Sequence, residues 1–198
     1  MEAVEIVRQN AESFSIVAEI DQQVPTVSAA REALLDRAMG LNWKRKSSQK
    51  LRRGRRPSEG LAFVARGTDG VLAGTVRLWD VATGDGRPVL LLGPLAVDPQ
   101  LKSAGIGKAL MSHAISEAKR LGHKAILLVG DEAYYGRFGF TAEKTGGLAM
   151  PGPYERHRFL ALELVPGSLD GATGTLRPSG RKAKPVSVTE AAGKVICL

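Results

Sequence analysis

The chain has 198 residues and a formal net charge of +8; 43% of the residues are hydrophobic and 24% are charged. These proportions are ordinary for one globular domain with its own core. The longest apolar run, 89–97, is far shorter than the roughly 20 residues that span a bilayer, and residues 1–10 lack the apolar stretch of a secretory signal. One cysteine, Cys197, cannot form an internal disulfide, and no Cys/His cluster has metal-ligand spacing. We expect a cytoplasmic protein without a metal or a membrane partner.

Hydrophobic periodicity predicts alternating strands and helices. A Thr-Asp-Gly turn at 68–70 separates two apolar runs and predicts a β-hairpin. Gly122 follows the clearest helical pattern and is placed to end that helix. The expected order is a strand at 14–20, a helix at 24–39, strands at 61–66, 71–79 and 89–97, a helix at 106–121, a strand at 125–129, a short helix at 133–138 and a strand at 159–164. Because a helix separates the strands at 89–97 and 125–129, we expect them to be parallel, within an α/β mixed sheet that carries helices on its faces.

The composition changes after Pro166, because residues 166–198 hold five glycines, three prolines and few large apolar side chains. We therefore expect residues 1–165 to form the domain and 166–198 to form a Gly/Pro-rich tail, extended or disordered over most of its length. Two short apolar runs in it, 186–188 and 195–198, could still add a strand or dock on a partner.

Much of the positive charge lies in the segment 44–56, which has no acidic residue. Three interpretations are open: a solvated surface, attraction of an anionic cofactor or substrate, or a nucleic-acid surface. Trp43 is the only aromatic residue beside it, so the segment lacks the platforms on which bases stack. We expect no nucleic-acid partner.

The strand expected at 89–97 is interrupted by Gly93 and Pro94. Proline donates no ladder hydrogen bond, and glycine within a strand often marks a bulge. We expect the strand to bend there and to free a backbone group. If the strand at 125–129 is its neighbour, the two splay apart and open a cleft.

A glycine-containing loop follows this strand and leads into the helix at 106–121. Gly105 and Gly107 lack a Cβ and let the backbone approach a bulky anion. The helix N-terminus favours phosphate, and Lys102 and Lys108 add positive charge on either side.

This loop matches neither common nucleotide motif. The third glycine of a dinucleotide fingerprint would fall at Leu110, and Gly107-Lys108 is followed by Ala109 instead of the Ser or Thr of a P-loop.

Together with the later segment Tyr135-Gly-Arg-Phe-Gly-Phe140, the loop resembles the GNAT superfamily of N-acetyltransferases. That family has a [QR]-x-x-G-x-[GA] loop for the coenzyme A pyrophosphate and a Y-x-[KR]-x-G-F segment. Here the first is Lys102-Ser-Ala-Gly-Ile-Gly107, and the second matches at its Tyr, Arg, Gly and Phe positions. The resemblance covers about residues 12–165. It implies a GNAT-like acyl-CoA N-acyltransferase fold, a central mixed sheet with a splayed, bulged strand and flanking helices.

The resemblance also implies a function: transfer of an acetyl group from acetyl-CoA, a co-substrate, directly to an amine of a small molecule or protein. Tyr135 would be the general acid that protonates the departing thiolate, and Leu95 and Val97 would bind the pantetheine arm through their backbone. A homodimer is the default expectation for such a fold. The coenzyme-binding residues implied are Leu95, Ala96, Val97, Lys102, Ser103, Ala104, Gly105, Ile106, Gly107 and Lys108.

The chain departs from the family at three places. Lys102 replaces the usual Gln or Arg, which keeps the charge and loses planar hydrogen bonding. The Asn that commonly precedes the Tyr helix is missing from 130–132. The strand at 89–97 holds no acid, so the general base stays open among Asp98, His113 and a water chain, although both side chains also suit ordinary structural roles.

Two other functions compete with this one. A domain of the same fold could bind acyl-CoA as a sensor or bind a protein partner without turnover, and turnover with any amine would exclude it. A basic nucleic-acid-binding protein would instead show steep salt dependence of binding.

Overall fold

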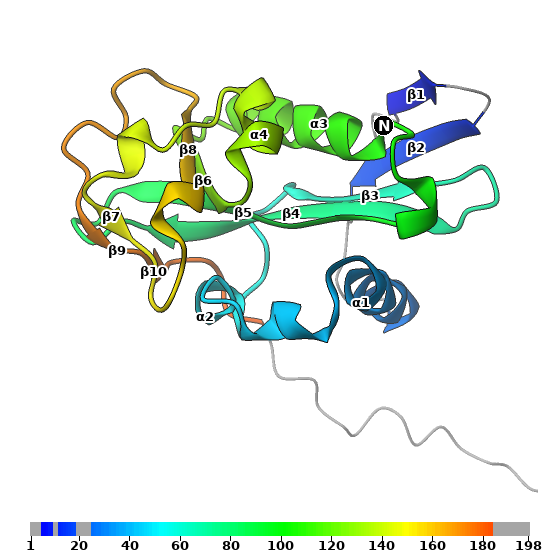
Figure 1. The fold of residues 1–198 in the computed structure, drawn as a ribbon, viewed down its shortest axis with the longest axis horizontal. Coiled ribbons are helices and arrows are strands. Elements are labelled where there is room, and N and C mark those ends of the chain that lie inside the picture. Colours follow the sequence, from blue (N-terminus) through cyan, green and yellow to red (C-terminus); the bar gives the residue numbers. More distant parts are fainter. Residues whose placement is uncertain (1–4, 10–11, 19–24, 184–198) are drawn as a thin grey trace, which may run out of the picture.

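The computed structural model describes residues 5–9, 12–18 and 25–183 (Figure 1). Its main feature is a mixed sheet with the strand order β1-β2-β3-β4-β5-β6-β8, and β10 pairs with β4 beside this path. β7 and β9 form a separate parallel pair. The strands and helices are β1 (Glu5–Gln9), β2 (Glu12–Ala18), α1 (Pro25–Met39), α2 (Gln49–Arg52), β3 (Ala62–Arg66), β4 (Leu72–Ala82), β5 (Pro88–Val97), α3 (Ile106–Arg120), β6 (Ala125–Val129), α4 (Glu132–Tyr135), β7 (Leu148–Ala149), β8 (Phe159–Glu163), β9 (Gly174–Thr175) and β10 (Arg177–Pro178), with 3-10 helices at Leu41–Arg45, Pro99–Leu101, Gly136–Phe138, Glu143–Thr145 and Arg156–Arg158.

The structure confirms the predicted order of elements and the parallel crossover. β5 and β6 are parallel, with Leu90 opposite Ile126, while the other neighbours along the strand path are antiparallel. In the predicted hairpin, Gly70 has φ +77°, and Asp69 Oδ1 accepts a hydrogen bond from the N–H of Val71 at 2.9 Å. β1 was not predicted, because its run of five residues mixes charged and apolar positions too briefly to show a period. Residues 19, 20 and 24 of the expected elements lie outside the described ranges.

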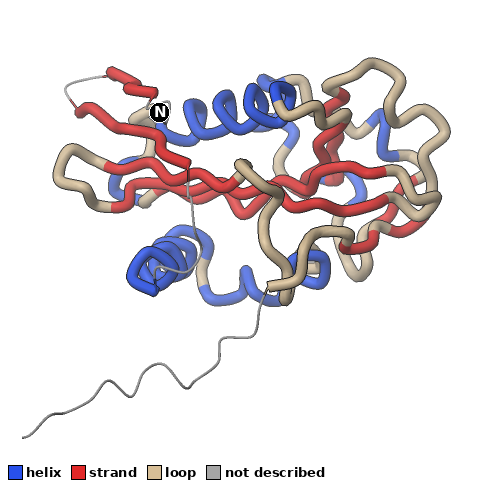
Figure 2. Tube along the Cα trace, turned by 180° about the vertical axis from the view of Figure 1, so that it is seen from behind, coloured by secondary structure: helices blue, strands red, loops and turns tan. Residues whose placement is uncertain are grey.

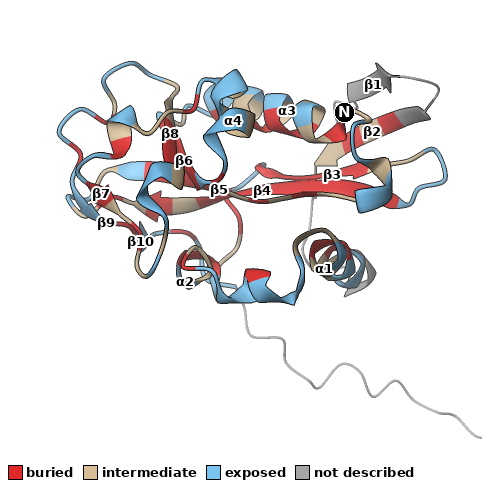
Figure 3. Cartoon of the chain, in the orientation of Figure 1, coloured by how far each residue is buried: buried red, intermediate tan, exposed pale blue. Residues whose placement is uncertain are grey.

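Helices cover both faces of the sheet: α3 and α4 lie on one face, and α1 and α2 on the other (Figures 1 and 2). On the first face, α3 buries Ile106, Leu110, Met111, Ala114 and Ala118. On the second, α1 buries Leu34 and Leu35. Figure 3 shows the buried residues concentrated in the sheet and on the helix sides that face it. Each fully buried leucine contributes about 1.5–3 kcal/mol, so the helices hold the sheet from both sides.

The end of α3 confirms the predicted glycine cap. Gly122 has φ +81°, and its N–H donates to the Lys119 carbonyl at 3.0 Å. The N–H of His123 donates to the Ala118 carbonyl at 3.0 Å. These two bonds form a Schellman motif, which satisfies carbonyls at the end of the helix.

The chain after Pro166 is packed, which corrects the expectation of a tail that begins there. Leu169, Ala172 and Leu176 are 2%, 5% and 1% exposed and belong to the same core cluster as Trp79. β10 extends the sheet by antiparallel pairing with the end of β4. Three apolar side chains at suitable spacing anchor the segment, and its glycines serve the turns between them.

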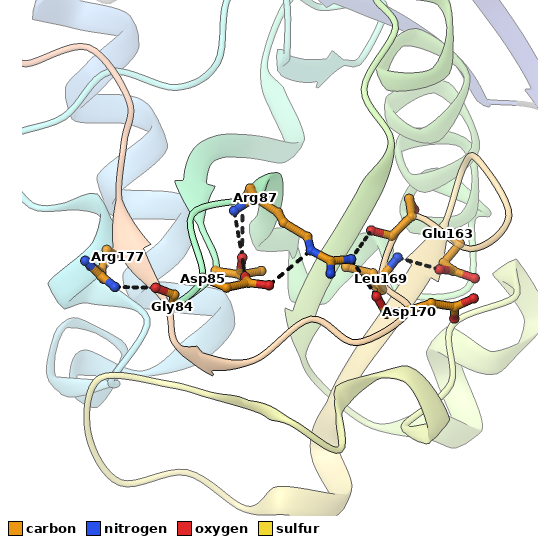
Figure 4. Close-up of polar contacts among 9 residues, drawn as sticks. Gly84, Asp85, Arg87, Glu163, Leu169, Asp170 and Arg177 are labelled. Carbon is orange, nitrogen blue, oxygen red and sulfur yellow. Dashed lines mark hydrogen bonds and ion pairs between the residues drawn. The ribbon is translucent and has the colours of Figure 1, made fainter.

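Hydrogen bonds hold this segment to the body of the domain (Figure 4). Arg87 Nη1 donates to the carbonyl of Asp170 at 2.6 Å, and Glu163 Oε1 accepts from the N–H of Leu169 at 2.7 Å. Arg177 donates to the carbonyl of Gly84. The packed part of the domain therefore extends through these residues. Residues 184–198, with Cys197 and the two apolar runs, lie outside the described ranges.

Within the described ranges, no helix is both long and apolar enough to span a membrane. In the same part of the chain, no three His, Cys, Asp or Glu side chains gather as ligands for a metal ion.

We predict that Leu176→Ala lowers the free energy of unfolding by about 2–5 kcal/mol, because it removes a buried side chain and leaves a cavity. Thr175→Ala is the matched control, since Thr175 is exposed, and it should change stability by no more than about 0.5 kcal/mol. Urea denaturation followed by circular dichroism measures both. Equal stability of the two variants would show that the segment adds nothing to the core.

Candidate functional site

A β-bulge interrupts β5 at Gly93 and Pro94, as predicted. Leu92 lies opposite Leu78 of β4, and Leu95 lies opposite Val76, so β5 has one more residue between these pairs than β4 has. Gly93 has φ +128°, a conformation that favours glycine. Its carbonyl accepts a hydrogen bond of 2.6 Å from the indole Nε1 of Trp79 on β4. A side-chain hydrogen bond from the neighbouring strand therefore holds the bulge in place, and no local sequence pattern predicts it.

β5 and β6 separate beyond the bulge, which confirms the predicted splay. Their parallel pairing ends where Leu91 faces Leu127. No strand in the described ranges pairs with this edge of β5 from there to its end. An open cleft lies at the separation, and its lining includes Trp43, Arg52, Pro94, Leu95 and Tyr135.

The loop between β5 and α3 leads into a helix start that is left uncapped. Ser103 and Gly105 have φ of +75° and +79°, in the left-handed region. Within the described chain, no side chain caps α3, and Ala109 N–H donates to the Gly105 carbonyl at 3.0 Å. The amide groups of residues 106–108 therefore have no partner within the helix, and the positive end of the helix dipole lies beside them. Such an end is suited to a phosphate.

The ten residues predicted to bind the coenzyme form one continuous path. Leu95, Ala96 and Val97 lie on the open edge of β5, and residues 102–108 follow it into α3. The side chains of Ala96 and Ile106 are buried, so they can offer a ligand only backbone groups. The side chains of Lys102, Ser103 and Lys108 are exposed beside the loop.

Tyr135 lies at the end of α4, a short helix whose start is capped when Asp131 Oδ1 accepts from the N–H of Ala133 at 3.1 Å. Its ring lies so close to Gly130 that a Cβ there would be 2.1 Å from Cε2. Gly130 thus makes room for the ring. Burial, with a smaller contribution from Tyr134, raises the pKa of Tyr135 to about 12, although Arg158 acts in the opposite direction.

Tyr134 points to a different part of the site. Its ring meets that of Tyr135 edge to face at 4.9 Å, and the Arg137 guanidinium lies 4.8 Å above it. A Cβ added to Gly107 would be 2.8 Å from the Tyr134 hydroxyl, so this hydroxyl reaches the first turn of α3. Helical periodicity does not show which loop a side chain meets, so this contact could not be predicted from the sequence.

Asp98 and His113 have structural contacts. Asp98 accepts hydrogen bonds from Arg37 at 2.9 Å and from the N–H of Gln100 at 3.0 Å, and these bonds hold its pKa below the usual range. His113 meets the ring of Phe63 edge to face at 4.7 Å. Neither side chain lines the cleft. The identity of the general base stays open.

The basic segment divides into an exposed part and a part that lines the cleft. Lys50 and Arg53 are exposed and do not line the cleft, whereas Arg52 is buried and lines it together with the exposed Lys46. Sequence reasoning missed this division, because the charges look alike along the chain and α2 is too short to show a buried face.

The model of the acetyltransferase (GNAT) family matches residues 29–140. The chain belongs to this family. Over 115 residues it is 29% identical to the N-acetyltransferase YhbS of Escherichia coli, and these residues make up 58% of this chain and 69% of YhbS. The crystal structure of E. coli YhbS in complex with CoA has a TM-score of 0.69 to this fold at 25% identity, covering 87% of this chain and 93% of that one.

A second solved structure agrees. A GNAT family acetyltransferase from Brucella melitensis, in complex with acetyl-CoA, has a TM-score of 0.54 at 25% identity and covers 87% of this chain and 96% of its own. The predicted family, fold and reaction class are confirmed: the chain is an acetyl-CoA-dependent N-acetyltransferase of the GNAT family. The individual site residues stay predictions.

We predict that Tyr135 is the last tyrosine of the folded protein to ionise. Because its folded pKa of about 12 exceeds the ordinary value near 10, its neutral form stabilises the fold below about pH 10, and this contribution is lost as the pH rises toward about 12. The ultraviolet absorbance of tyrosinate, followed against pH, should lose its most alkaline step in Tyr135→Phe. Tyr154→Phe is the control and should keep that step. Loss of an ordinary step near pH 10 in Tyr135→Phe would contradict the assignment.

Proposed function

We propose that this enzyme transfers the acetyl group directly from acetyl-CoA to an amine, with Tyr135 as general acid and the open edge of β5 as the binding surface for the coenzyme. The observation that carries the proposal is this edge, which in the described ranges runs without a strand partner from the bulge to the uncapped amides at the start of α3. The acceptor is an amine of a small molecule or a protein.

The residues along this path suit the chemical groups of coenzyme A. The amides of residues 105–108 and the helix dipole favour the pyrophosphate, and Lys102 and Lys108 add charge in solvent. The pantetheine arm contains amide groups, and the backbone of Leu95 and Val97 offers the hydrogen bonds of an unpaired strand edge. The complexes of YhbS with CoA and of the Brucella enzyme with acetyl-CoA support this assignment.

In the reaction, the amine nitrogen of the acceptor attacks the carbonyl carbon of the acetyl group. A C–N bond forms, the C–S bond breaks, and the electron pair of that bond stays on sulfur. Tyr135 donates its proton to the sulfur, and the amine releases a proton to solvent or to a base. With a pKa of about 12, Tyr135 stays protonated at neutral pH and is always ready to donate. The same burial makes a thiolate in the cleft more basic, which keeps the proton transfer favourable.

We expect acetyl-CoA and CoA to raise the melting temperature, since they bind the native cleft and not the unfolded chain, whereas NAD should leave it unchanged. Thermal denaturation with each compound tests this. Gly105→Asn should lose most of the shift, because Asn tolerates the left-handed backbone of Gly105 and adds a side chain where the phosphate would lie. An equal shift with NAD, or none with CoA, would exclude the coenzyme assignment.

Tyr135→Phe should lower kcat by at least about tenfold and leave the KM for acetyl-CoA nearly unchanged, because its hydroxyl acts when charge develops on sulfur. Steady-state kinetics with thiol-release detection measures both constants. Tyr134→Phe is the control: its hydroxyl lies at the first turn of α3, so kcat should stay within about threefold while the KM for acetyl-CoA changes. If Tyr134→Phe alone lowers kcat, the two tyrosines have the opposite roles.

A further inference from the structure

Arg52 is a buried cation whose hydrogen-bonding capacity is only partly used. Its side chain is held from within its own segment: Nε donates to the Ser48 carbonyl at 3.2 Å, and Nη2 donates to the Ser48 hydroxyl at 2.6 Å. Nη1 is buried and has no hydrogen-bond partner among the described residues, and the residue as a whole is 8% exposed. A buried charged donor without a partner is costly, so this nitrogen is suited to a ligand.

The charges around Arg52 are positive. Burial, together with the nearby Arg77, lowers its pKa to about 9. Burial, Arg158 and Arg52 all lower the pKa of Lys46, which lines the same cleft. Arg158 does contact one acid, Glu155 at 3.5 Å, but that carboxylate is 61% exposed. No carboxylate in the described ranges contributes to the pKa shift of Arg52 or Lys46, so the cluster has an excess of positive charge that an anion would balance.

The position of Arg52 places such an anion beside the reaction centre. Nη1 lies 3.8 Å from where a Cβ on Gly93 would be, which is at the bulge that opens the cleft. Tyr135 lines the same cleft. The coenzyme loop, in contrast, lies at the far end of β5, at the start of α3. Arg52 therefore faces the acceptor side of the cleft, away from the coenzyme phosphates.

We propose that the acceptor is a small molecule that carries an oxyanion, a carboxylate or a phosphate, in addition to its amine, and that Arg52 and Lys46 bind this oxyanion. The inference rests on the proposed function and adds the substrate class to it. Binding of the oxyanion at Arg52 holds the amine near the bulge, where the acetyl group is transferred. A purely cationic polyamine lacks the group that this cluster requires and adds like charge to it.

Matched acceptor pairs test the proposal with the intact protein and acetyl-CoA. One series compares amino acids with their amides, and the other compares aminoalkyl phosphates with the same amines lacking the phosphate. We expect the anionic member of each productive pair to have a kcat/KM at least about tenfold higher, because a site built for a polar group discriminates strongly against an analogue that lacks it. The series that contains the productive pairs distinguishes a carboxylate from a phosphate.

Arg52→Gln should raise the KM for the anionic acceptor at least about tenfold and abolish the preference over the neutral partner, while the KM for acetyl-CoA stays unchanged. Arg53→Gln is the matched control, since Arg53 is the exposed neighbour, and it should keep both. Arg52→Lys should restore part of the preference because it restores the charge. A merely structural role for Arg52 would not alter the preference between two acceptors.

The outcomes separate this inference from the proposed function. If CoA raises the melting temperature but only neutral or polycationic amines are acetylated, or no member of either anionic series is, the acceptor assignment is wrong and the coenzyme site stands. Retention of the anionic preference in Arg52→Gln also overturns it. If CoA produces no shift, the proposed function itself fails.

Discussion

The hydrogen bond from the Trp79 indole to the Gly93 carbonyl lies at the point of β5 where a strand buried on both edges becomes a strand with one open edge. The first half of the strand must be buried between β4 and β6, and the second half must leave β6 so that a ligand can lie along its edge. A bulge with glycine at φ +128° changes the direction of the strand, and the indole satisfies the carbonyl that the bulge exposes. The cleft and the route from β5 to α3 depend on this change of direction.

The positive potential at the two ends of the open edge has different physical origins. At the start of α3 the positive potential comes from backbone amides and a helix dipole, with the charged lysines in solvent. At the bulge it comes from side chains, above all from buried Arg52, whose surroundings of low dielectric strengthen each interaction. Between these ends the lining is apolar and aromatic, which suits an uncharged thioester. In the proposed function, this arrangement separates the anionic coenzyme from the acceptor along one strand.

The predictable features of this protein are those with local causes. The bulge follows from Gly93 and Pro94, the hairpin from its Asp-Gly turn, and the end of α3 from Gly122, because each depends on the backbone preferences of a few adjacent residues. The glycine-containing loop before α3 was recognised from its own residues in the same way, and its assignment to the coenzyme stays a prediction from the family resemblance. The direction of the Tyr134 hydroxyl, the burial of Arg52 and the packing of Leu176 depend on contacts between segments far apart in sequence. For the segment that contains Leu176 the composition led to a wrong prediction, because glycines and prolines that form turns in a packed segment look the same in composition as those of a disordered tail.

The packed segment after Pro166 has a consequence for biosynthesis. Leu169 and Leu176 complete the core cluster that surrounds Trp79, and Arg55, just after α2, donates to the carbonyl of Gly180 at 2.6 Å. A ribosome therefore makes β4, β5 and β6 well before it makes the last residues of the core cluster to which these strands contribute. Native packing of the second core cluster has to wait until nearly the whole domain has emerged from the exit tunnel, so the apolar faces of β4 and β5 are exposed during translation and depend on chaperones or on fast completion of the chain.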